Sequence, residues 1–173
     1  MDASSQYKDS LPTSPDAVMA LLEKLEIDFS THQHPPLRTV EDAKVHRGEM
    51  SGIHIKNLFL RDRKKRNFLL VAQEDQNVDI KSLQALIGCD RLSFGSADRL
   101  FEMLGVRPGA VSPLSLINDP DHKVNLLLDK ALETHQRVYA HPLVNDLTLG
   151  IDGGDLQRFF MHIGHEPCWL VLE

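Results

Sequence analysis

The sequence predicts a single α/β domain with a mixed central β-sheet and short helices packed around it. The chain has 173 residues, of which 42% are hydrophobic, enough for one core that buries roughly two thirds of the unfolded surface. Short strand-like runs alternate irregularly with short helical patterns, which disfavours a regular doubly wound parallel sheet. Neither an internal repeat nor a low-complexity linker divides the chain. We therefore expect one domain.

The N-terminal part predicts a flexible segment followed by a helix. Residues 1–13 are polar and contain nothing to bury, so we expect them to be frayed and the domain to span residues 14–173. Ser14 is a suitable N-cap and Pro15 a suitable first helical residue. The apolar residues that follow have the spacing of one helical face: Val18, Leu21, Leu22 and Leu25.

A strand and a second helix are predicted next. The segment "IDFSTHQH" alternates apolar and polar residues and stops at Pro35, as a strand would. Thr39 followed by Asp42 resembles a capping box that opens a short helix through about Lys44.

A hairpin with a basic tip is predicted over residues 57–71. The runs "NLFL" and "NFLLV" have strand composition, and the charged run at 61–66 lies between them. Asp79 and Ser96 then begin two short helices that end at Gly88 and Gly105. The segment "GVRPGAVSP", residues 105–113, contains too many glycines and prolines for regular structure and predicts a shaped loop.

The C-terminal half predicts strands around one clear helix. The runs "VNLLLD", "RVYA" and "LTLGI" indicate short strands, with a helical turn near residues 130–135. Asp152 opens a helix with an apolar stripe that ends at Gly164. The final segment, "CWLVLE", predicts a buried strand.

Composition excludes several classes of protein. A formal net charge of −6 argues against a DNA-coating or membrane-surface protein, because these use a basic field over the whole domain. Cys89 and Cys168 lie far apart, which suggests neither a disulfide scaffold nor a zinc knuckle. No apolar run approaches the ~20 residues needed to span a bilayer. We expect a cytoplasmic protein.

Three features have both a structural and a functional interpretation. The basic run at 61–66 is either a solvated turn or a contact for nucleic-acid phosphates. Lys56, just before an apolar run, either extends its ammonium group to solvent or has a role in a functional site. The glycines of the loop either end a helix or let backbone N–H groups approach a ligand and stabilise an oxyanion.

Other chemistry has less support. His32 and His34 would share one face of a strand, and His162 and His165 lie at a helix end. Neither pair has a third ligand nearby in sequence, so we expect no metal. The serine-hydrolase pattern G-x-S-x-G is absent, and neither cysteine has an obvious reactive context.

Four features in order resemble the YbaK/ProX superfamily of aminoacyl-tRNA editing domains. They are Lys56 before "NLFLRD", the loop "GVRPGAVSP", His141-Pro142 with Asn145 and Thr148, and the helical segment "GGDLQRFF". The resemblance extends from about Ser14 to the C-terminus. This group occurs as an insertion in bacterial prolyl-tRNA synthetases and as free-standing proteins. The bare domain is most similar to the ProX proteins, which hydrolyse alanine from mischarged tRNA(Pro).

The resemblance implies trans-editing hydrolysis of Ala-tRNA(Pro) without metal or cofactor. It implies that Lys56 lies near the terminal adenosine and that the basic tip contacts acceptor-stem phosphates. The residues expected at the catalytic centre are Lys56, Gly105, Pro108, Gly109, His141 and Asn145. Those expected to bind the substrate are Val106, Arg107, Ser112, Thr148, Arg61, Arg63, Lys64 and Lys65.

The expected partner is the acceptor end of tRNA, with prolyl-tRNA synthetase or an elongation factor as further candidates and neither membrane nor DNA. The sequence departs from the family pattern in two places. Leu114 and Ser115 follow Pro113 where an aromatic residue and glycine are common, and Asp146 and Leu147 stand where smaller residues are usual. A non-catalytic tRNA-binding module with the same fold is the alternative, and a metal-dependent hydrolase is a third possibility.

Overall fold

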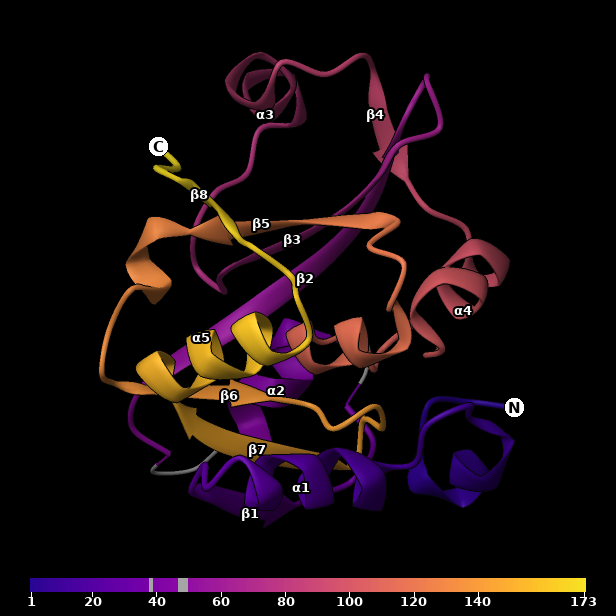
Figure 1. Cartoon of the computed structure of the whole chain (residues 1–173), viewed down its shortest axis with the longest axis vertical. Helices are drawn as coiled ribbons and strands as arrows, with labels where there is room; N and C mark the ends of the chain where they lie inside the picture. The colour runs from indigo at the N-terminus through magenta and orange to yellow at the C-terminus, as the bar shows by residue number, and fades with distance from the viewer. Residues whose placement is uncertain (38, 47–49) are drawn as a thin grey trace.

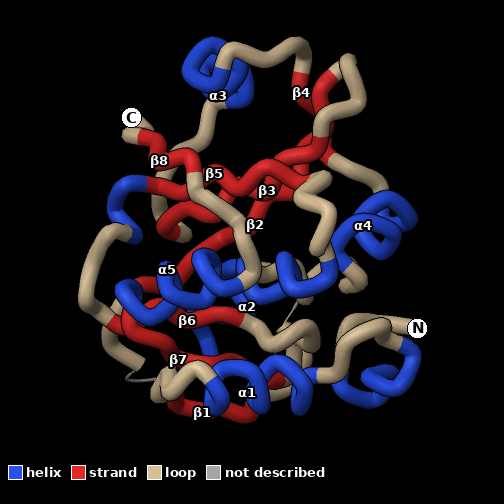
Figure 2. Tube along the Cα trace, in the orientation of Figure 1, coloured by secondary structure: helices blue, strands red, loops and turns tan. Residues whose placement is uncertain are grey.

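A computed structural model describes residues 1–37, 39–46 and 50–173 and confirms the predicted fold class (Figures 1 and 2). One mixed eight-stranded sheet has the order β1-β7-β6-β2-β3-β5-β8, and β4 pairs with β2. The strands are β1 (Phe29–Gln33), β2 (Ile53–Asp62), β3 (Asn67–Gln73), β4 (Leu92–Phe94), β5 (Val124–Asp129), β6 (Arg137–Ala140), β7 (Leu147–Asp152) and β8 (Cys168–Leu170).

Short helices surround this sheet. The α-helices are α1 (Pro15–Lys24), α2 (Val40–His46), α3 (Ile80–Ile87), α4 (Ala97–Leu104) and α5 (Gly153–His162), and the 3₁₀-helices are η1 (Ser5–Ser10), η2 (Pro113–Asn118) and η3 (Lys130–Leu132). Figure 1 shows α1 beside β1 and β7 at one end and α3 near β4 and β8 at the other.

Local sequence signals explain where the helices begin and end. The Ser14 hydroxyl accepts a hydrogen bond from the N–H of Ala17, and the Ser96 hydroxyl accepts one from Arg99, each satisfying an N–H that lacks an intrahelical acceptor. The Thr39 hydroxyl likewise accepts from the N–H of Asp42. Gly88 and Gly105 end α3 and α4 in the left-handed conformation, which glycine adopts without a Cβ penalty. These predicted helices are confirmed.

Strand β2 joins the two halves of the sheet. Its first residues pair in parallel with β6, Ile53 opposite Val138, and the rest of the strand pairs antiparallel with β3, from Ile55 opposite Gln73 to Arg61 opposite Asn67. The larger core contains Leu69, Val71 and both phenylalanines of α5. A smaller cluster on the other face packs Leu60, Phe68, Leu70 and Leu83 of α3. Residues of one strand thus contribute to both.

The basic tip is shorter than the sequence predicts. Arg61 and Asp62 belong to β2, and the turn consists of residues 63–66, with Lys65 at φ +68°. Asp62 is buried and accepts hydrogen bonds from the backbone N–H and Nε of Arg66 at 2.8 and 2.7 Å. Burial would raise the pKa of Asp62, but the hydrogen bonds and charge of Arg66 lower it below its usual value. This buried ion pair shapes the turn.

Both ends of the chain differ from the expectation. Ala3 and Ser4 are buried, so the view that residues 1–13 contain nothing to bury is wrong. At the other end, β8 pairs in parallel with β5 but only Leu170 is buried, while Cys168 and Val171 are exposed. The short strand β4 and helix η2 were not predicted. Within the described residues, no helix is long and apolar enough to cross a membrane.

Candidate functional site

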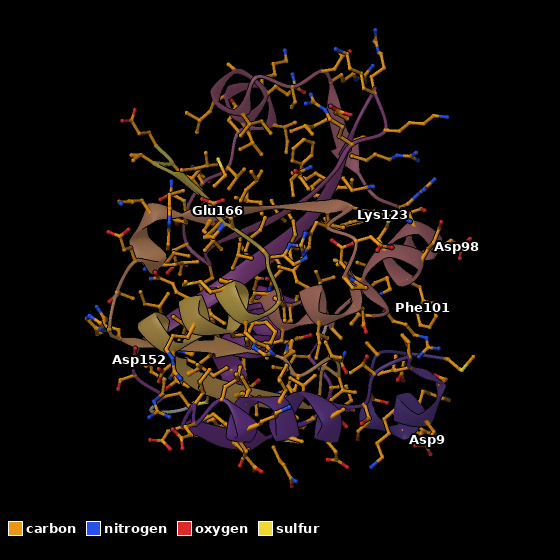
Figure 3. The ribbon with its side chains drawn as sticks, in the orientation of Figure 1. Asp9, Asp98, Phe101, Lys123, Asp152 and Glu166 are labelled. Carbon is orange, nitrogen blue, oxygen red and sulfur yellow. The ribbon has the colours of Figure 1, made fainter. Side chains whose placement is uncertain are left out.

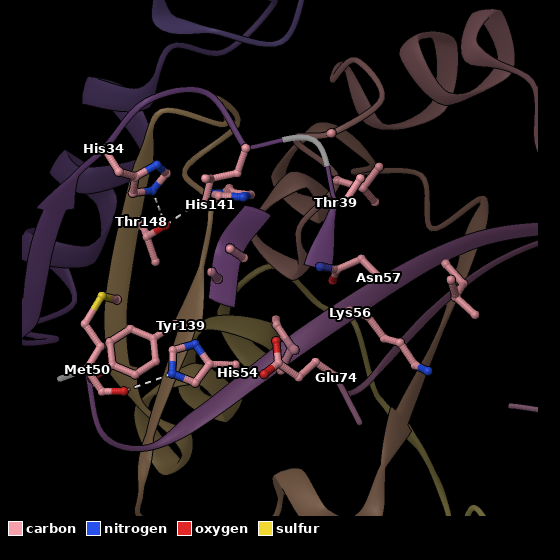
Figure 4. Close-up of a pocket in the computed structure, with 17 residues that line it drawn as sticks. His34, Thr39, Met50, His54, Lys56, Asn57, Glu74, Tyr139, His141 and Thr148 are labelled. Atoms are coloured by element: carbon pink, nitrogen blue, oxygen red, sulfur yellow. Dashed lines mark hydrogen bonds between the residues drawn. The ribbon is translucent and has the colours of Figure 1, made fainter. Parts of the chain in front are cut away.

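A pocket of about 450 Å³ lies where the first half of β2 faces β6 and the start of β7 (Figure 4). The segment before and within α2 and the end of the glycine-proline loop complete its walls. The polar side chains that line it come from five separate segments of the chain: His34, Thr39, His54, Lys56, Asn57, Glu74, Tyr139, His141 and Thr148. Lys56, His141 and Thr148 were predicted from the sequence, together with Gly109.

Thr148 connects two histidines at one end of this pocket. Its hydroxyl oxygen lies 2.7 Å from Nε2 of His34 and 3.3 Å from Nδ1 of His141, as the dashed lines in Figure 4 show. Thr148 is at the start of β7, opposite His32 of β1. Strand pairing therefore brings the segment that follows β1 against the turn between β6 and β7.

The neighbours of the two rings decide which nitrogens carry protons. Nδ1 of His141 lies 2.8 Å from the carbonyl oxygen of Leu147, and Nδ1 of His34 lies 2.9 Å from that of Pro35. A carbonyl oxygen only accepts, so each Nδ1 must donate, and in a neutral ring Nε2 then keeps a lone pair. The Thr148 hydroxyl accordingly donates to Nε2 of His34.

His141 is held in its neutral form. Burial lowers the pKa of His141 because a charged imidazolium is poorly solvated there, and neighbouring His34 lowers it further, against the opposing hydrogen bond to Leu147. At neutral pH its Nε2 is thus a hydrogen-bond acceptor on the pocket wall. Such an atom can orient a water molecule and take a proton from it.

A second histidine forms another wall of the pocket. His54 stacks on Tyr139, with ring centroids 4.7 Å apart, and donates from Nε2 to the carbonyl of Met50 at 2.9 Å. The Tyr139 hydroxyl donates to the carbonyl of Ser51. These contacts hold both rings in fixed orientations, so this wall is preorganised for a flat or apolar group.

Lys56 and Asn57 are adjacent on β2 but point in different directions. Figure 4 shows the amide of Asn57 directed toward the side that holds His141, and the Lys56 ammonium directed away from it. The Lys56 ammonium donates to the carbonyl of Gln76. Within the described residues, Oδ1 of Asn57 is buried and has no hydrogen-bond donor. Because an unpaired buried oxygen is costly, Asn57 is a candidate for binding a donor on a ligand.

Only the end of the glycine-proline loop reaches the pocket, through Gly109 and Val111. The N–H of Gly105 donates to the carbonyl of Phe101 as part of the helix end, so it is not the oxyanion donor that was expected. The N–H of Ala110 is bonded to Arg107. Among the residues that the structure describes, the N–H groups of Gly109 and Val111 have no acceptor, and they remain candidate donors.

The other predicted loop residues do not line this pocket. Val106 is buried in the larger core, and Ser112 caps η2 by accepting from the N–H of Leu114. Arg107 and Pro108 line a separate cavity beside the N-terminal residues. A glycine-rich pattern cannot distinguish these roles, because they depend on what packs against each residue.

Asn145 lies behind the pocket, not in it. Its side-chain N–H donates to the carbonyl of Leu37 at 2.9 Å, and its own carbonyl accepts from the N–H of Leu37 at 3.1 Å. Leu37 lines the pocket. The structure thus places Asn145, which was expected at the catalytic centre, outside the pocket lining and in a position that fixes Leu37.

The basic tip lies at the other end of β2 from the pocket. Six residues separate Lys56 from Asp62, which is ~20 Å along a strand. Arg63, Lys64 and Lys65 are exposed, whereas Arg61 is partly buried and has a buried Nε without a hydrogen-bond acceptor in the described part of the chain. The pocket and the tip are therefore two separate features, as the sequence predicted.

Three histidines outside the pocket have structural contacts. His165 is buried, donates from Nε2 to the carbonyl of Asp119 at 3.0 Å and packs edge-on against His122. His32 is hydrogen-bonded to Ser30 and packs against Tyr139. Residues 1–37, 39–46 and 50–173 contain no group of three or more histidine, cysteine, aspartate or glutamate residues arranged to hold a metal ion.

The polar pocket residues that sequence reasoning did not assign to the site are His34, Thr39, His54, Asn57, Glu74 and Tyr139. Asn57 directly follows Lys56, and a polar residue inside a predicted strand was a usable signal. Of the others, His54 and Tyr139 lie within strands and His34 directly follows β1, so the pairing of β1, β2, β6 and β7 is what brings these three together.

Comparison with known proteins gives a consistent result. Residues 34–159 match the family described as "Aminoacyl-tRNA editing domain". The chain is 40% identical over 143 residues to "Prolyl-tRNA editing protein ProX" of Acetoanaerobium sticklandii, covering 82% of this chain and 87% of that protein. It is 36% identical over 154 residues to "Prolyl-tRNA synthetase associated domain-containing protein 1" of Danio rerio, covering 88% and 84%.

The fold also matches solved structures. The crystal structure of hypothetical protein APE2540 superposes with a TM-score of 0.69 at 20% identity, covering 90% of this chain and 99% of that chain. At this identity the match supports the fold alone.

Proposed function

Because the chain belongs to the aminoacyl-tRNA editing domain family, we propose that it is a trans-editing deacylase that hydrolyses alanine from mischarged Ala-tRNA(Pro). The reaction is hydrolysis of the ester between the alanyl group and the terminal ribose, without a metal or cofactor. The observation that carries this proposal is the neutral His141, which lines the same small pocket as Lys56 and Asn57 and has its Nδ1 bonded to the carbonyl of Leu147.

An aminoacyl ester is already activated, so it needs a positioned water molecule and not a protein nucleophile. In the proposed step, Nε2 of His141 accepts a proton from water while the water oxygen adds to the ester carbonyl. The ester C–O bond then breaks, the ribose oxygen takes a proton from the imidazolium, and alanine leaves as the free acid. The N–H groups of Gly109 and Val111 are the candidate donors to the developing oxyanion.

The substrate's charged ends have candidate partners in the same pocket. Oδ1 of Asn57 would accept from the α-ammonium group of alanine, which satisfies an otherwise unpaired oxygen. Lys56 would place its positive charge beside the terminal nucleotide, if its ammonium exchanges the Gln76 carbonyl for a substrate oxygen. A small pocket admits alanine and excludes proline by size. A synthetase site built for proline cannot exclude the smaller alanine in the same way.

The basic tip would bind the acceptor stem. Arg63, Lys64 and Lys65 are exposed ~20 Å along β2 from Lys56, and clustered cations release counterions from phosphates without reading bases. A non-catalytic tRNA-binding module would use the same tip, so the tip does not separate the two functions.

The test is deacylation of Ala-tRNA(Pro), Pro-tRNA(Pro) and Ala-tRNA(Ala) by the purified protein, with and without a chelator. We expect chelator-resistant hydrolysis of Ala-tRNA(Pro) in preference to the other two, and a large loss in Lys56→Ala. Lys81→Ala, an exposed lysine on α3, is the matched control and should retain activity. Tight tRNA binding without any deacylation would support the binding module, and loss of activity with chelator would support a metal-dependent hydrolase.

A further inference from the structure

The first five residues are hydrogen-bonded to the turn at residues 142–147, which lies between His141 and Thr148 of the pocket. The carbonyl of Ala3 accepts from the N–H of Asn145 at 2.9 Å, and Ser5 donates its N–H and its hydroxyl to the two carboxylate oxygens of Asp146. Ala3 and Ser4 are buried. Figures 1 and 3 show the N-terminal segment beside α4, with Phe101 on the side of that helix nearest to it.

The same turn holds the pocket residues through its other hydrogen bonds. The carbonyl of Asp146 accepts from the N–H of His34 at 3.2 Å, and the carbonyl of Leu147 fixes Nδ1 of His141. Asn145 is bonded to Leu37 in both directions. Each residue of the turn that contacts residues 1–5 is therefore bonded to a residue that lines the pocket.

The N-terminal segment also contacts the glycine-proline loop. A Cβ placed on Gly109 would lie 3.2 Å from the side-chain amide nitrogen of Asn145 and 3.9 Å from the Cβ of Ala3, so Gly109 packs close to both side chains. Farther along, Thr13 donates to Asn118, and Asn118 donates to the carbonyl of Leu104 at the start of the loop. The N-terminal segment thus lies close to Gly109, a candidate oxyanion donor, and is bonded to the turn residues Asn145 and Asp146.

We propose that residues 1–5 form a clip that positions the catalytic pocket, with Asn145 and Asp146 as the positioning residues that transmit its effect. This proposal rests on the proposed function and concerns residues that lie outside the matched family segment, 34–159. The clip adds no group that touches the substrate. It holds the 142–147 turn so that His34, Thr148 and His141 keep the spacing that leaves Nε2 of His141 free for water.

The clip can be released without unfolding the domain. The clip buries few apolar side chains, since only Ala3 among its hydrophobic residues is buried and Met1 is exposed. The larger core and the smaller cluster are formed by other residues. Elements with few buried apolar contacts open at lower free energy than the rest of a structure. A small displacement of catalytic groups can nevertheless lower a rate by up to about a hundredfold.

The test compares three full-length or nearly full-length proteins with the wild type. Ala3→Asp places a charge at a buried position and should displace the clip, and deletion of residues 2–5 removes it. Ser10→Ala is the matched control, because the Ser10 hydroxyl bonds only the nearby carbonyl of Tyr7. The measurements are single-turnover deacylation of Ala-tRNA(Pro), tRNA affinity, thermal unfolding, and hydrogen exchange of the His34 and Asn145 amides.

We expect Ala3→Asp and the deletion to lower the single-turnover rate by about ten- to a hundredfold, with tRNA affinity and Tm close to wild type and faster exchange at both amides. Ser10→Ala should match the wild type in every measurement. An unchanged rate, or unchanged exchange at His34 after the clip is removed, would overturn the proposal. An inactive wild type would count against the proposed function. Hydrogen exchange needs no substrate, so the exchange rate of the His34 amide would still test whether residues 1–5 act as a clip.

Discussion

The two ends of strand β2 differ in how their polar side chains are held. At its first half, the pocket places Asn57 opposite a neutral His141, and the ammonium of Lys56 is bonded to a carbonyl. At its far end, Arg63, Lys64 and Lys65 are exposed, and Arg66 is paired with buried Asp62. The pocket end is built from hydrogen bonds with defined direction, and the tip end from exposed charge.

Substitutions at the two ends of β2 should therefore have different effects on the protein's activity. Groups that act by geometry lose their effect when one atom is moved, because a hydrogen bond weakens steeply with angle and distance. Exposed charges act together over a Debye length of about 10 Å, and each contributes a small, salt-dependent part. Rate should therefore report on the pocket and affinity on the tip.

The largest expected effect is at the pocket end. His141→Ala should lower the single-turnover rate of deacylation by about 10²–10⁴-fold, because it removes the proposed proton acceptor, and should leave tRNA affinity near wild type. His141→Gln keeps an amide donor near Leu147 without an imidazole and should be equally slow. His162→Ala, an exposed histidine at the end of α5, is the control. A loss in His162→Ala as large as in His141→Ala would break the comparison.

A smaller effect is expected at the tip. Replacing Arg63, Lys64 and Lys65 by serine should weaken tRNA binding and reduce the slope of log affinity against log salt by about 2, at ~0.7 to 0.9 for each phosphate that the variant no longer neutralises. The rate at saturating tRNA should not change. The measurement is filter binding or anisotropy across a salt series.

The control for the tip is a second triple variant with the same change in net charge, in which Lys8, Lys24 and Lys81 become serine. These lysines are exposed and belong to η1, α1 and α3, not to the turn at residues 63–66. Equal slopes for the two triple variants would mean that only net charge matters and that the tip is a solvated turn.

The smallest expected effect is the dependence of the free energy of unfolding on pH, which we assign to histidines outside the tip. Burial lowers the pKa values of His32, His141 and His165 below 6.5, with Arg137 and His34 adding to the effect at His32. In the unfolded chain these rings take up protons near pH 6.5, before the native rings do, so the free energy of unfolding should fall as pH drops through that value. Each pKa unit of difference corresponds to about 1.4 kcal/mol at most.

Urea unfolding at pH 7.5 and pH 5.5 measures this loss. His165→Gln retains a donor for the Asp119 carbonyl and should show a smaller loss than the wild type, whereas the triple tip variant should show the wild-type loss. Equal or greater stability of the wild type at pH 5.5 would contradict the assignment of these histidines as neutral in the folded state.

Much of the fold was predictable because its signals are local. Ser14, Ser96 and Gly105 act on backbone groups within four residues of themselves, and the hairpin joins strands that are neighbours in sequence. The site was predictable only in part. Lys56, His141 and Thr148 were expected there. His34, however, follows β1, which pairs with β7 more than a hundred residues later, and Tyr139 of β6 lies opposite His54 of β2. Register between such strands depends on the whole core.

The sequence alone predicted the helix ends, the hairpin, the separation of Lys56 from the basic tip and the family. Each of these depends on residue type and short spacing. The tertiary structure was needed to show that Asn145 fixes Leu37 beside the pocket and that His141 is neutral with its Nδ1 bonded to the carbonyl of Leu147. Burial and hydrogen-bond partners set those properties, and both come from segments that meet only when the chain is folded.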